Sequence, residues 1–126
     1  MADQEKEGKI FHVEDDTDFT VRLNEVLQSR GSSIVLSATT VEQASSMIPD
    51  RLVEAGVNLS IIDGILPDGK GKEVAELIRA ARLHIPIIAL TSLESTWGDL
   101  NISKIDGPRK LFEAIATALC ERPTRE

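Results

Sequence analysis

The chain has 126 residues, the length of one ordinary domain, and its content of 41% hydrophobic and 28% charged residues is typical of globular proteins. A formal net charge of −7, without a cluster of lysine and arginine to offset it, argues against direct contact with DNA or RNA. The charged N-terminal segment lacks the apolar stretch of a signal peptide, and no apolar run approaches the roughly 20 residues that span a membrane. We therefore expect a cytoplasmic protein without membrane contact, in which residues 1–8 are a flexible lead-in, 9–121 one domain and 122–126 a tail.

Five short stretches rich in aliphatic and β-branched residues predict strands. They cover residues 9–13, 33–37, 58–62, 86–90 and 101–105. Helical patterns separate most of these stretches, and connections between parallel strands ordinarily contain a helix. The alternation predicts an α/β fold, a three-layer sandwich with helices on both faces of a five-stranded parallel sheet.

The helical patterns differ in how clearly they begin and end. The first follows the first strand and ends at Gly31, a residue suited to the position just past a helix. The second begins at Thr40 and is interrupted by Pro49, so we expect it in two pieces. The third and the last cover residues 71–84 and 107–121.

The segment between the fourth and fifth strands, TSLESTWGDL, is too short and too rich in turn residues for an ordinary crossover helix. We expect the helix there to be absent or reduced to a loop. Its absence would uncover apolar sheet surface, which Leu93, Trp97 and Leu100 could cover. Two alternatives stay open: Trp97 folds back into the core, or the region from Leu93 to Leu100 contacts a partner or forms a homodimer.

Carboxylates gather where the first and third strands end. Glu14 and Asp15 follow the first strand, and Asp63 follows the third. Taken singly, such acids can simply favour a helix start or a turn. The two strands are neighbours in a doubly wound sheet, however, and sites lie beyond the carboxyl ends of its strands. Like charges ~4 Å apart repel by roughly 4 kcal/mol at an effective dielectric near 20, so the cluster requires either raised pKa values or a cation. If a cation is bound, all-oxygen ligation favours Mg²⁺ or Mn²⁺.

Two further polar side chains are expected at the same edge. Thr91 ends the fourth strand and Lys104 lies near the end of the fifth. Alone, Thr91 could cap a turn and Lys104 could extend into solvent. A carboxylate, a metal site, a hydroxyl and an ammonium in one cleft are the set used in phosphoryl transfer to a carboxylate, with Asp63 as the nucleophile.

At this point the sequence resembles the receiver domain of response regulators in two-component signalling. The resemblance extends from Lys9 to Glu121 and rests on the pair Glu14-Asp15, on DGILPDGKG from Asp63, on PIIALTS from Pro86, and on Lys104. It implies a flavodoxin-like doubly wound sheet in the order 2-1-3-4-5. The short segment after the fourth strand predicts that the fourth helix of this fold is absent or reduced to a loop.

The resemblance also implies roles for the clustered residues. Asp63 would accept a phosphoryl group from a histidine kinase or a phosphotransfer protein, and Thr91 and Lys104 would contact that group. The implied metal ligands are Glu14, Asp15, Asp63 and the backbone carbonyl of Ile65. Such a protein is not an enzyme in the ordinary sense, because it catalyses only its own phosphorylation and dephosphorylation and signals by contact with a downstream protein.

The sequence departs from the family pattern at three points, of which the missing helix and the missing aromatic residue favour an alternative. The interval from Thr91 to Lys104 is 13 residues (104 − 91), where the family usually has roughly 20 or more. Asn101 stands where the family leads us to expect an aromatic residue, and Ile105 where it typically has a proline. The alternative is a receiver-like interaction module that works without phosphorylation. A metal-dependent phosphatase is disfavoured, because Ile65 stands where such an enzyme has its second acid.

Overall fold

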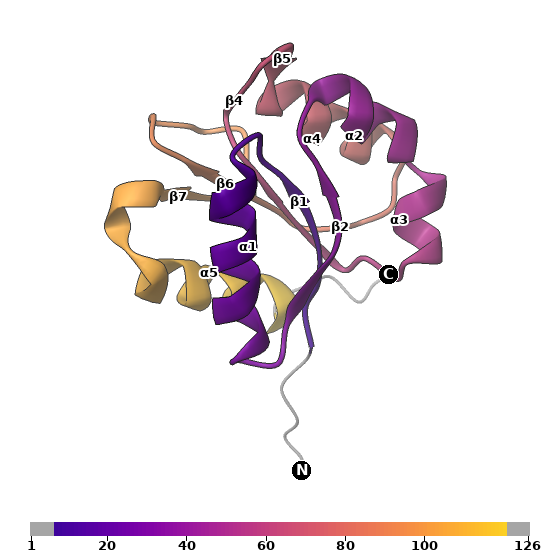
Figure 1. Cartoon of the computed structure of the whole chain (residues 1–126). Helices are drawn as coiled ribbons and strands as arrows, with labels where there is room; N and C mark the ends of the chain where they lie inside the picture. The colour runs from indigo at the N-terminus through magenta and orange to yellow at the C-terminus, as the bar shows by residue number, and fades with distance from the viewer. Residues whose placement is uncertain (1–6, 121–126) are drawn as a thin grey trace.

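The computed structural model describes residues 7–120, which form a parallel sheet between two layers of helices (Figure 1). The strands of this sheet are β1 (Lys9–Val13), β2 (Ser33–Ala38), β3 (Leu59–Ile62), β6 (Ile87–Thr91) and β7 (Leu100–Ser103). Their order is β2-β1-β3-β6-β7, and every neighbouring pair is parallel. The predicted fold class and strand order are therefore confirmed. The predicted tail and most of the predicted lead-in lie outside the described residues.

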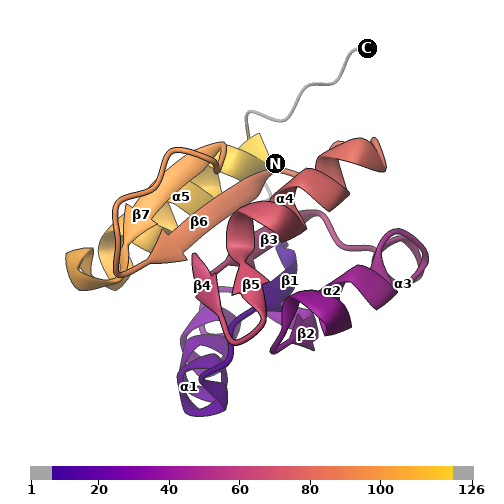
Figure 2. The same ribbon diagram turned by 90° about the horizontal axis from the view of Figure 1, so that it is seen from above.

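The helices lie on both faces of the sheet (Figure 2). One face carries α1 (Thr17–Gln28) and α5 (Pro108–Cys120), and the other carries α2 (Val41–Met47), α3 (Asp50–Glu54) and α4 (Gly71–Ala80). Because side chains alternate along a strand, neighbouring residues of β1 enter different cores. Ile10 joins the cluster beside α1 and α5, and Phe11 joins the cluster beside α2 and α4. None of the described helices is long and apolar enough to cross a membrane.

Local sequence explains where the helices on the first half of the chain begin. The Asp16 carboxylate accepts a hydrogen bond from the backbone N–H of Phe19 at the start of α1. The Thr40 hydroxyl does the same for Gln43 at the start of α2. Pro49 separates α2 from α3, which confirms the predicted division of this helix.

A short antiparallel hairpin that the sequence did not predict lies between β3 and α4. It consists of β4 (Ile65–Leu66) and β5 (Gly69–Lys70). The Asp68 carboxylate at its turn accepts hydrogen bonds from the first backbone N–H groups of α2, on Val41 and Glu42, which lowers the pKa of Asp68. At Gly71 a Cβ atom would lie 2.0 Å from the backbone oxygen of Asp63, so only glycine allows α4 to begin there.

The predicted fifth strand was wrong at its end. The strand β7 stops at Ser103, and the 3₁₀ turn η1 (Lys104–Asp106) follows. The Ser103 hydroxyl accepts from the N–H of Ile105 at 3.3 Å, and the Asp106 carboxylate accepts from the N–H of Ser103 at 3.3 Å. These two local bonds turn the backbone away from the extended course of the strand.

The segment between β6 and β7, residues 92–99, contains no helix, as predicted. Its second half lies directly on the sheet. The carboxylate and the N–H of Asp99 exchange hydrogen bonds of 2.8 Å each with the backbone of Ile87 at the start of β6. The Asn101 side chain accepts from the Ser95 hydroxyl and the Gly98 N–H, and donates to the Gly98 carbonyl. Asn101, where an aromatic residue was expected, thus holds the loop that replaces the helix.

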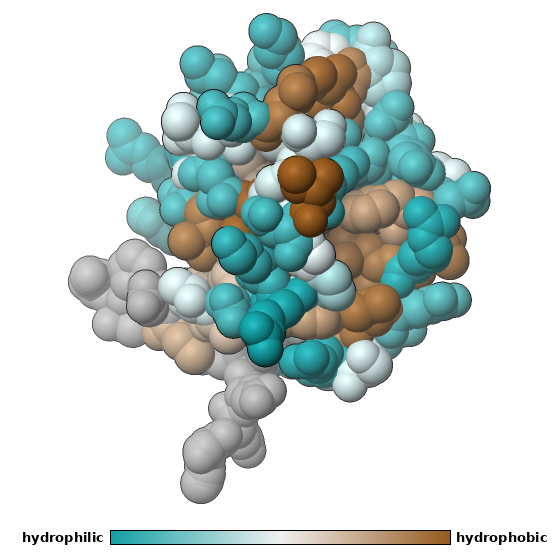
Figure 3. All heavy atoms as spheres, turned by 90° about the vertical axis from the view of Figure 1, so that its left-hand side faces the viewer, coloured by the Kyte–Doolittle hydropathy of each residue, from teal (hydrophilic) through white to brown (hydrophobic). Residues whose placement is uncertain are grey.

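The apolar residues of this region have different environments. Trp97 is partly buried against the core cluster beside α4, and Leu100 packs against the other cluster, whereas Leu93 is 55% exposed. On the side of the molecule drawn in Figure 3, hydrophobic side chains form several patches separated by hydrophilic ones. The packing supports the alternative in which Trp97 folds back into the core. A partner or homodimer contact through Leu93 to Leu100 stays a prediction.

Replacing Trp97 with alanine should lower the free energy of unfolding by about 2 kcal/mol, because the indole is partly buried against the core. The matched control is Leu93→Ala, which should change it by less than about 0.5 kcal/mol since Leu93 is mostly exposed. Urea unfolding of both variants measures the difference. Equal stability of the two variants would show that Trp97 does not fill the core.

Replacing Gly98 with alanine should also destabilise the protein, by about 1–3 kcal/mol. A Cβ atom at this position would lie 2.6 Å from the carbonyl oxygen of Leu100 and 2.8 Å from the backbone nitrogen of Ala89, and backbone atoms cannot move aside easily. Thr96→Ala, an exposed site in the same loop, is the control in the same urea experiment and should be nearly neutral. A neutral Gly98→Ala variant would contradict the close packing of the loop on the sheet.

Candidate functional site

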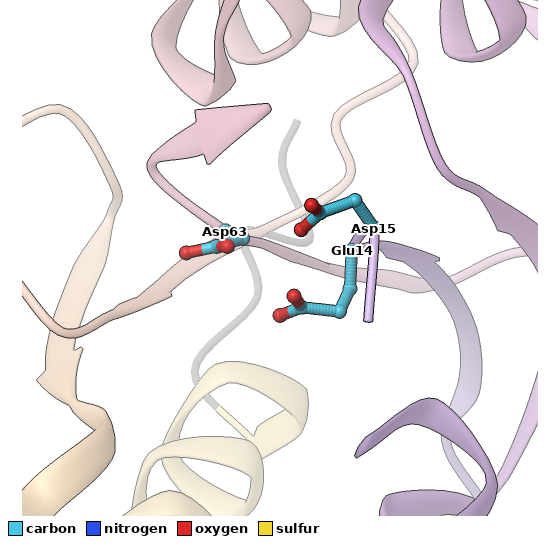
Figure 4. A group of neighbouring side chains, drawn as sticks. All are labelled: Glu14, Asp15 and Asp63. Carbon is cyan, nitrogen blue, oxygen red and sulfur yellow. The ribbon is translucent and has the colours of Figure 1, made fainter. Parts of the chain in front are cut away.

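The predicted carboxylates meet at one edge of the sheet (Figure 4). Val13 and Ile62 are paired at the ends of β1 and β3, and the N–H of Asp63 donates to the carbonyl of Val13 at 2.9 Å. This pairing brings carboxylate oxygens of Glu14, Asp15 and Asp63 within 4.8 Å of one another. Glu14 and Asp63 are buried, and Asp15 is exposed.

Lys104 provides the positive charge of this cluster. Its Nζ atom lies 2.7 Å from Oε1 of Glu14 and 3.6 Å from Oδ2 of Asp63. Burial opposes the charged form of Lys104, but the hydrogen bond and charge of Glu14 and the charge of Asp63 outweigh it, so the pKa of the ammonium is raised. Although Lys104 lies in η1 and not on the strand, the structure places it at the predicted site.

The environment of Glu14 contains opposing effects. Burial raises the pKa of its carboxyl group most strongly, the hydrogen bond from Lys104 lowers it, and the charge of Asp63 raises it again. The net direction is upward, which is the expected response of a buried acid beside another acid. The cluster thus combines one ammonium with three acidic groups.

Asp63 and Thr91 are brought together by a glycine that sequence reasoning did not single out. The N–H of Gly64 donates to Oδ1 of Asp63 at 2.7 Å. A Cβ atom on Gly64 would lie 2.8 Å from Oγ1 of Thr91, so glycine leaves room for the buried hydroxyl. That hydroxyl accepts from the N–H of Leu93 at 3.3 Å. Ile65 follows at the start of β4, and the role of its carbonyl as a metal ligand stays a prediction.

A layer of side chains beneath the cluster was also missed as part of the site. The ring of Phe19 lies under Lys104, with Nζ 4.7 Å from the ring centroid, a distance at which a cation and an aromatic face attract. His12 is buried beside it, and its Nδ1 atom lies 3.2 Å from the Thr20 hydroxyl. Burial and then the charge of Lys104 lower the pKa of His12 to about 4, so its ring is neutral at pH 7. The helical spacing of Phe19 indicated a core residue and gave no sign of contact with Lys104.

The donor set fits a divalent cation. Three carboxylates offer oxygen atoms within 4.8 Å of one another, and a hard cation such as Mg²⁺ or Mn²⁺ takes oxygen ligands. A single ammonium does not neutralise the cluster, so a dication would remove the remaining repulsion. Glu14 would have to share its carboxylate between the cation and Lys104, because its Oε1 atom is already bonded to Nζ.

Comparison with known proteins identifies the family. The model of the response regulator receiver domain matches residues 10–99. The chain belongs to this family. The match begins in β1 and includes Glu14, Asp15, Asp63 and Thr91, but ends before Lys104. No curated protein matches the chain by sequence.

Solved structures of receiver domains have the same fold. A CheY-like receiver domain protein from Methanospirillum hungatei JF-1 is 26% identical with a TM-score of 0.79, over 93% of this chain and 97% of that one. The response regulator TrrA from Thermotoga maritima, solved in complex with Mg²⁺-BeF, is 27% identical with a TM-score of 0.76, over 89% of this chain and 99% of that one. The non-phosphorylated HemR receiver domain from Leptospira biflexa is 21% identical with a TM-score of 0.79, over 94% and 99% of the two chains, and shows the fold alone.

In metal-free buffer, His12 should make the receiver domain less stable as the pH falls. The pKa of His12 is 6.5 in the unfolded chain and about 4 in the folded protein, so unfolding takes up a proton between these values. The stabilisation that comes from the neutral His12 ring is fully present above pH 6.5, and it is lost as the pH falls toward 4. Between pH 6.5 and 5 the loss amounts to about 2 kcal/mol, at 1.36 kcal/mol for each pH unit.

The comparison is with His12→Val, which has no titrating ring at this position. Urea unfolding at pH 7 and pH 5 should show a smaller loss of stability on acidification in the variant. The carboxylates, including Glu14 with its raised pKa, are present in both proteins. They therefore contribute to the change in stability between pH 7 and pH 5 in the native protein and in the variant alike. Equal losses in the two proteins would show that His12 is not held neutral by burial.

Proposed function

We propose that this receiver domain accepts a phosphoryl group on Asp63 from the phosphohistidine of a histidine kinase or phosphotransfer protein, in a reaction that requires Mg²⁺ or Mn²⁺. The observation that carries the proposal is the convergence of Asp63 with two further carboxylates and with Lys104. The complex of TrrA with Mg²⁺-BeF supports it, because that protein is similar to this chain over nearly its whole length.

The chain's own residues would act on the phosphoryl group in distinct ways. A carboxylate oxygen of Asp63 forms a bond to phosphorus while the phosphorus–nitrogen bond of the phosphohistidine breaks. Lys104, which lies 3.6 Å from Oδ2 of Asp63, supplies positive charge to the phosphoryl oxygens, and the Thr91 hydroxyl donates a hydrogen bond to one of them. Glu14, Asp15 and Asp63 would hold the dication, which would further neutralise the charge of the transferred group.

The Thr91 hydroxyl also connects the site to the loop at residues 92–99. It accepts from the N–H of Leu93, so a movement of Thr91 toward the phosphoryl group would displace Leu93. Trp97 in the core and the bonds of Asn101 hold the second half of the loop. The moving part is therefore the exposed segment 92–94, which we propose as the surface that a downstream protein recognises.

A groove beside the site suits the protein that donates the phosphoryl group. It has a volume of about 240 Å³, lies between α1 and the start of α5, and includes Lys104 in its lining. Its apolar walls include Val26, which is 41% exposed, and Phe112. Contact of the donor with this groove would bring its phosphohistidine close to Lys104 and Asp63.

The alternative is a receiver-like module that binds its partner without phosphorylation. The bonds of Asn101 and the packing of Trp97 favour it, because both hold the loop in place in the protein without a phosphoryl group. In either case the protein acts through protein contacts. As a phosphoacceptor it would catalyse only its own phosphorylation and dephosphorylation. We propose that it does so in the cytoplasm, without binding nucleic acid.

The test is an amide NMR titration with Mg²⁺ followed by beryllofluoride, a stand-in for the phosphoryl group. Mg²⁺ should shift signals near Glu14, Asp15 and Asp63, and beryllofluoride should then shift those of Thr91 to Glu94 and Lys104 in slow exchange. Asp63→Asn should abolish the beryllofluoride response, because its amide cannot form the oxygen–beryllium bond.

Asp18→Asn is the matched control, since Asp18 is an exposed acid at the start of α1 outside the cluster, and it should keep both responses. If beryllofluoride leaves the native spectrum unchanged in the presence of Mg²⁺, Asp63 is not a phosphoacceptor. The module that acts without phosphorylation then becomes the better account.

A further inference from the structure

A second cavity lies far from the carboxylate cluster, at the opposite end of the sheet. Its volume is about 600 Å³. It is bordered by Ile87 and Leu100, the first residues of β6 and β7, whereas Thr91 of the site is the last residue of β6. Four residue steps along a strand span about 13 Å, so the two regions are separate.

The cavity lies where the segment between β6 and β7 contains no helix. A crossover helix between two parallel strands packs on the face of the sheet, beside the helix that precedes them. Here the segment 92–99 runs directly to β7, and Asp99 and Leu100 are its contribution to the lining. The other walls are the end of α4, the turn that follows it, and the C-terminal half of α5, where Thr117 and Ala118 lie.

The lining combines an apolar floor with a cationic rim. The floor consists of aliphatic side chains: Ile78, Ile85, Ile87, Leu100 and Ala118. The rim carries Arg79, Arg82 and His84, and the acid in the lining is Asp99. The Asp99 carboxylate is already engaged, with Oδ1 3.2 Å from Arg79 and Oδ2 bonded to the N–H of Ile87. Within residues 7–120, Arg82 and His84 form no ion pair.

The backbone of the turn after α4 provides a second, independent observation. Arg82 and His84 have φ values of 56° and 58°, and they are the non-glycine residues with positive φ among those described. This left-handed conformation is unfavourable for residues with a Cβ atom, by about 1–2 kcal/mol each. Leu83 between them packs against the core. The turn thus holds a guanidinium and an imidazole at the cavity in a conformation that glycine or asparagine would adopt more easily.

We propose that this cavity binds a small molecule that has an apolar body and one anionic group, a carboxylate or a phosphate. The apolar body would lie on the aliphatic floor, and the anion would pair with Arg82 and His84 at the rim. The volume is within the range of about 300–1,000 Å³ for small-molecule sites. Charge complementarity selects the anion: the chain as a whole carries −7, yet this rim has a positive balance.

Binding of such an anion would also weaken a contact of the loop at residues 92–99. Arg79 bonds Asp99, the last residue of this loop, and a ligand anion close to Arg79 would compete with that carboxylate. The pair is exposed, with 44% and 52% of the two side chains accessible, so exchange of one anion for another requires little rearrangement. The site is independent of phosphorylation at Asp63.

The experiment titrates the protein with octanoate as the carboxylate probe and with octyl phosphate as the phosphate probe. Amide NMR spectra detect the binding of each probe. Both should cause saturable shifts at Ile78 to Ile87 and at Asp99 and Leu100. Octanol, which has the apolar body without the charge, should bind at least tenfold more weakly. The stronger of the two anionic probes identifies the preferred group, and raising the salt concentration should weaken both but leave octanol unchanged.

Two variants separate binding from a structural role. The double variant Arg82→Asn with His84→Asn removes the guanidinium and the imidazole and suits the left-handed backbone, so it should bind the anionic probes at least tenfold more weakly. Its melting temperature should equal or exceed that of the native protein, since the strain is reduced. Arg109→Gln, at an exposed position on the first turn of α5, removes one cation outside the cavity and should keep the native affinity.

Three results would overturn the proposal. Octanol binding as tightly as octanoate would show an apolar cavity without anion selectivity. The absence of saturable shifts at the cavity would show that no site exists there. Shifts of the same residues on raising the protein concentration alone, together with sedimentation as a dimer, would show an interface between copies of the chain. Asp63→Asn should leave probe binding unchanged, so failure here is distinguishable from failure of the phosphoacceptor proposal.

Discussion

The parallel pairing of β1 with β3 is the constraint on which the site depends. Because Val13 lies opposite Ile62 at the ends of these strands, the residues that follow them, Glu14 and Asp63, must lie side by side. The repulsion between their carboxylates is opposed by Lys104, which reaches them from η1 at the end of β7. The position of that ammonium in turn depends on the pairing of β6 with β7 and on the face of Phe19 beneath it.

Because no helix follows β6, other interactions hold the segment between β6 and β7 on the edge of the sheet. The loop at residues 92–99 can lie directly on the sheet because Gly98 has no side chain where it meets Ala89. Asn101 bonds the loop from the outer strand, and Trp97 fills part of the core beside α4. Polar side-chain bonds and one aromatic ring therefore do what a packed apolar helix does in an ordinary crossover connection.

Much of the fold and of the site could be predicted from the sequence, because both depend on local pattern and strand order. Alternating strand and helix patterns fix the sheet, and the sheet then brings Asp63 to Glu14. Features that depend on particular contacts could not be predicted. The turn at Lys104 is made by two hydrogen bonds around Ser103 and Asp106, which override the β-like pattern NISKI. Each strand of the β4–β5 hairpin has only two residues, too few for a periodic signal.

The two ends of the loop at residues 92–99 lie at opposite ends of β6, and this geometry limits how they can influence each other. Its first residues are bonded to Thr91, and its last residue, Asp99, is bonded to Ile87 and Arg79. Between them, the bonds of Asn101 to Ser95 and Gly98 fix the middle of the loop to β7. A displacement of Leu93 can therefore end at Ser95 without reaching Asp99. Coupling between the phosphoacceptor and the cavity requires these bonds to open, which makes Asn101 the residue that separates the two regions.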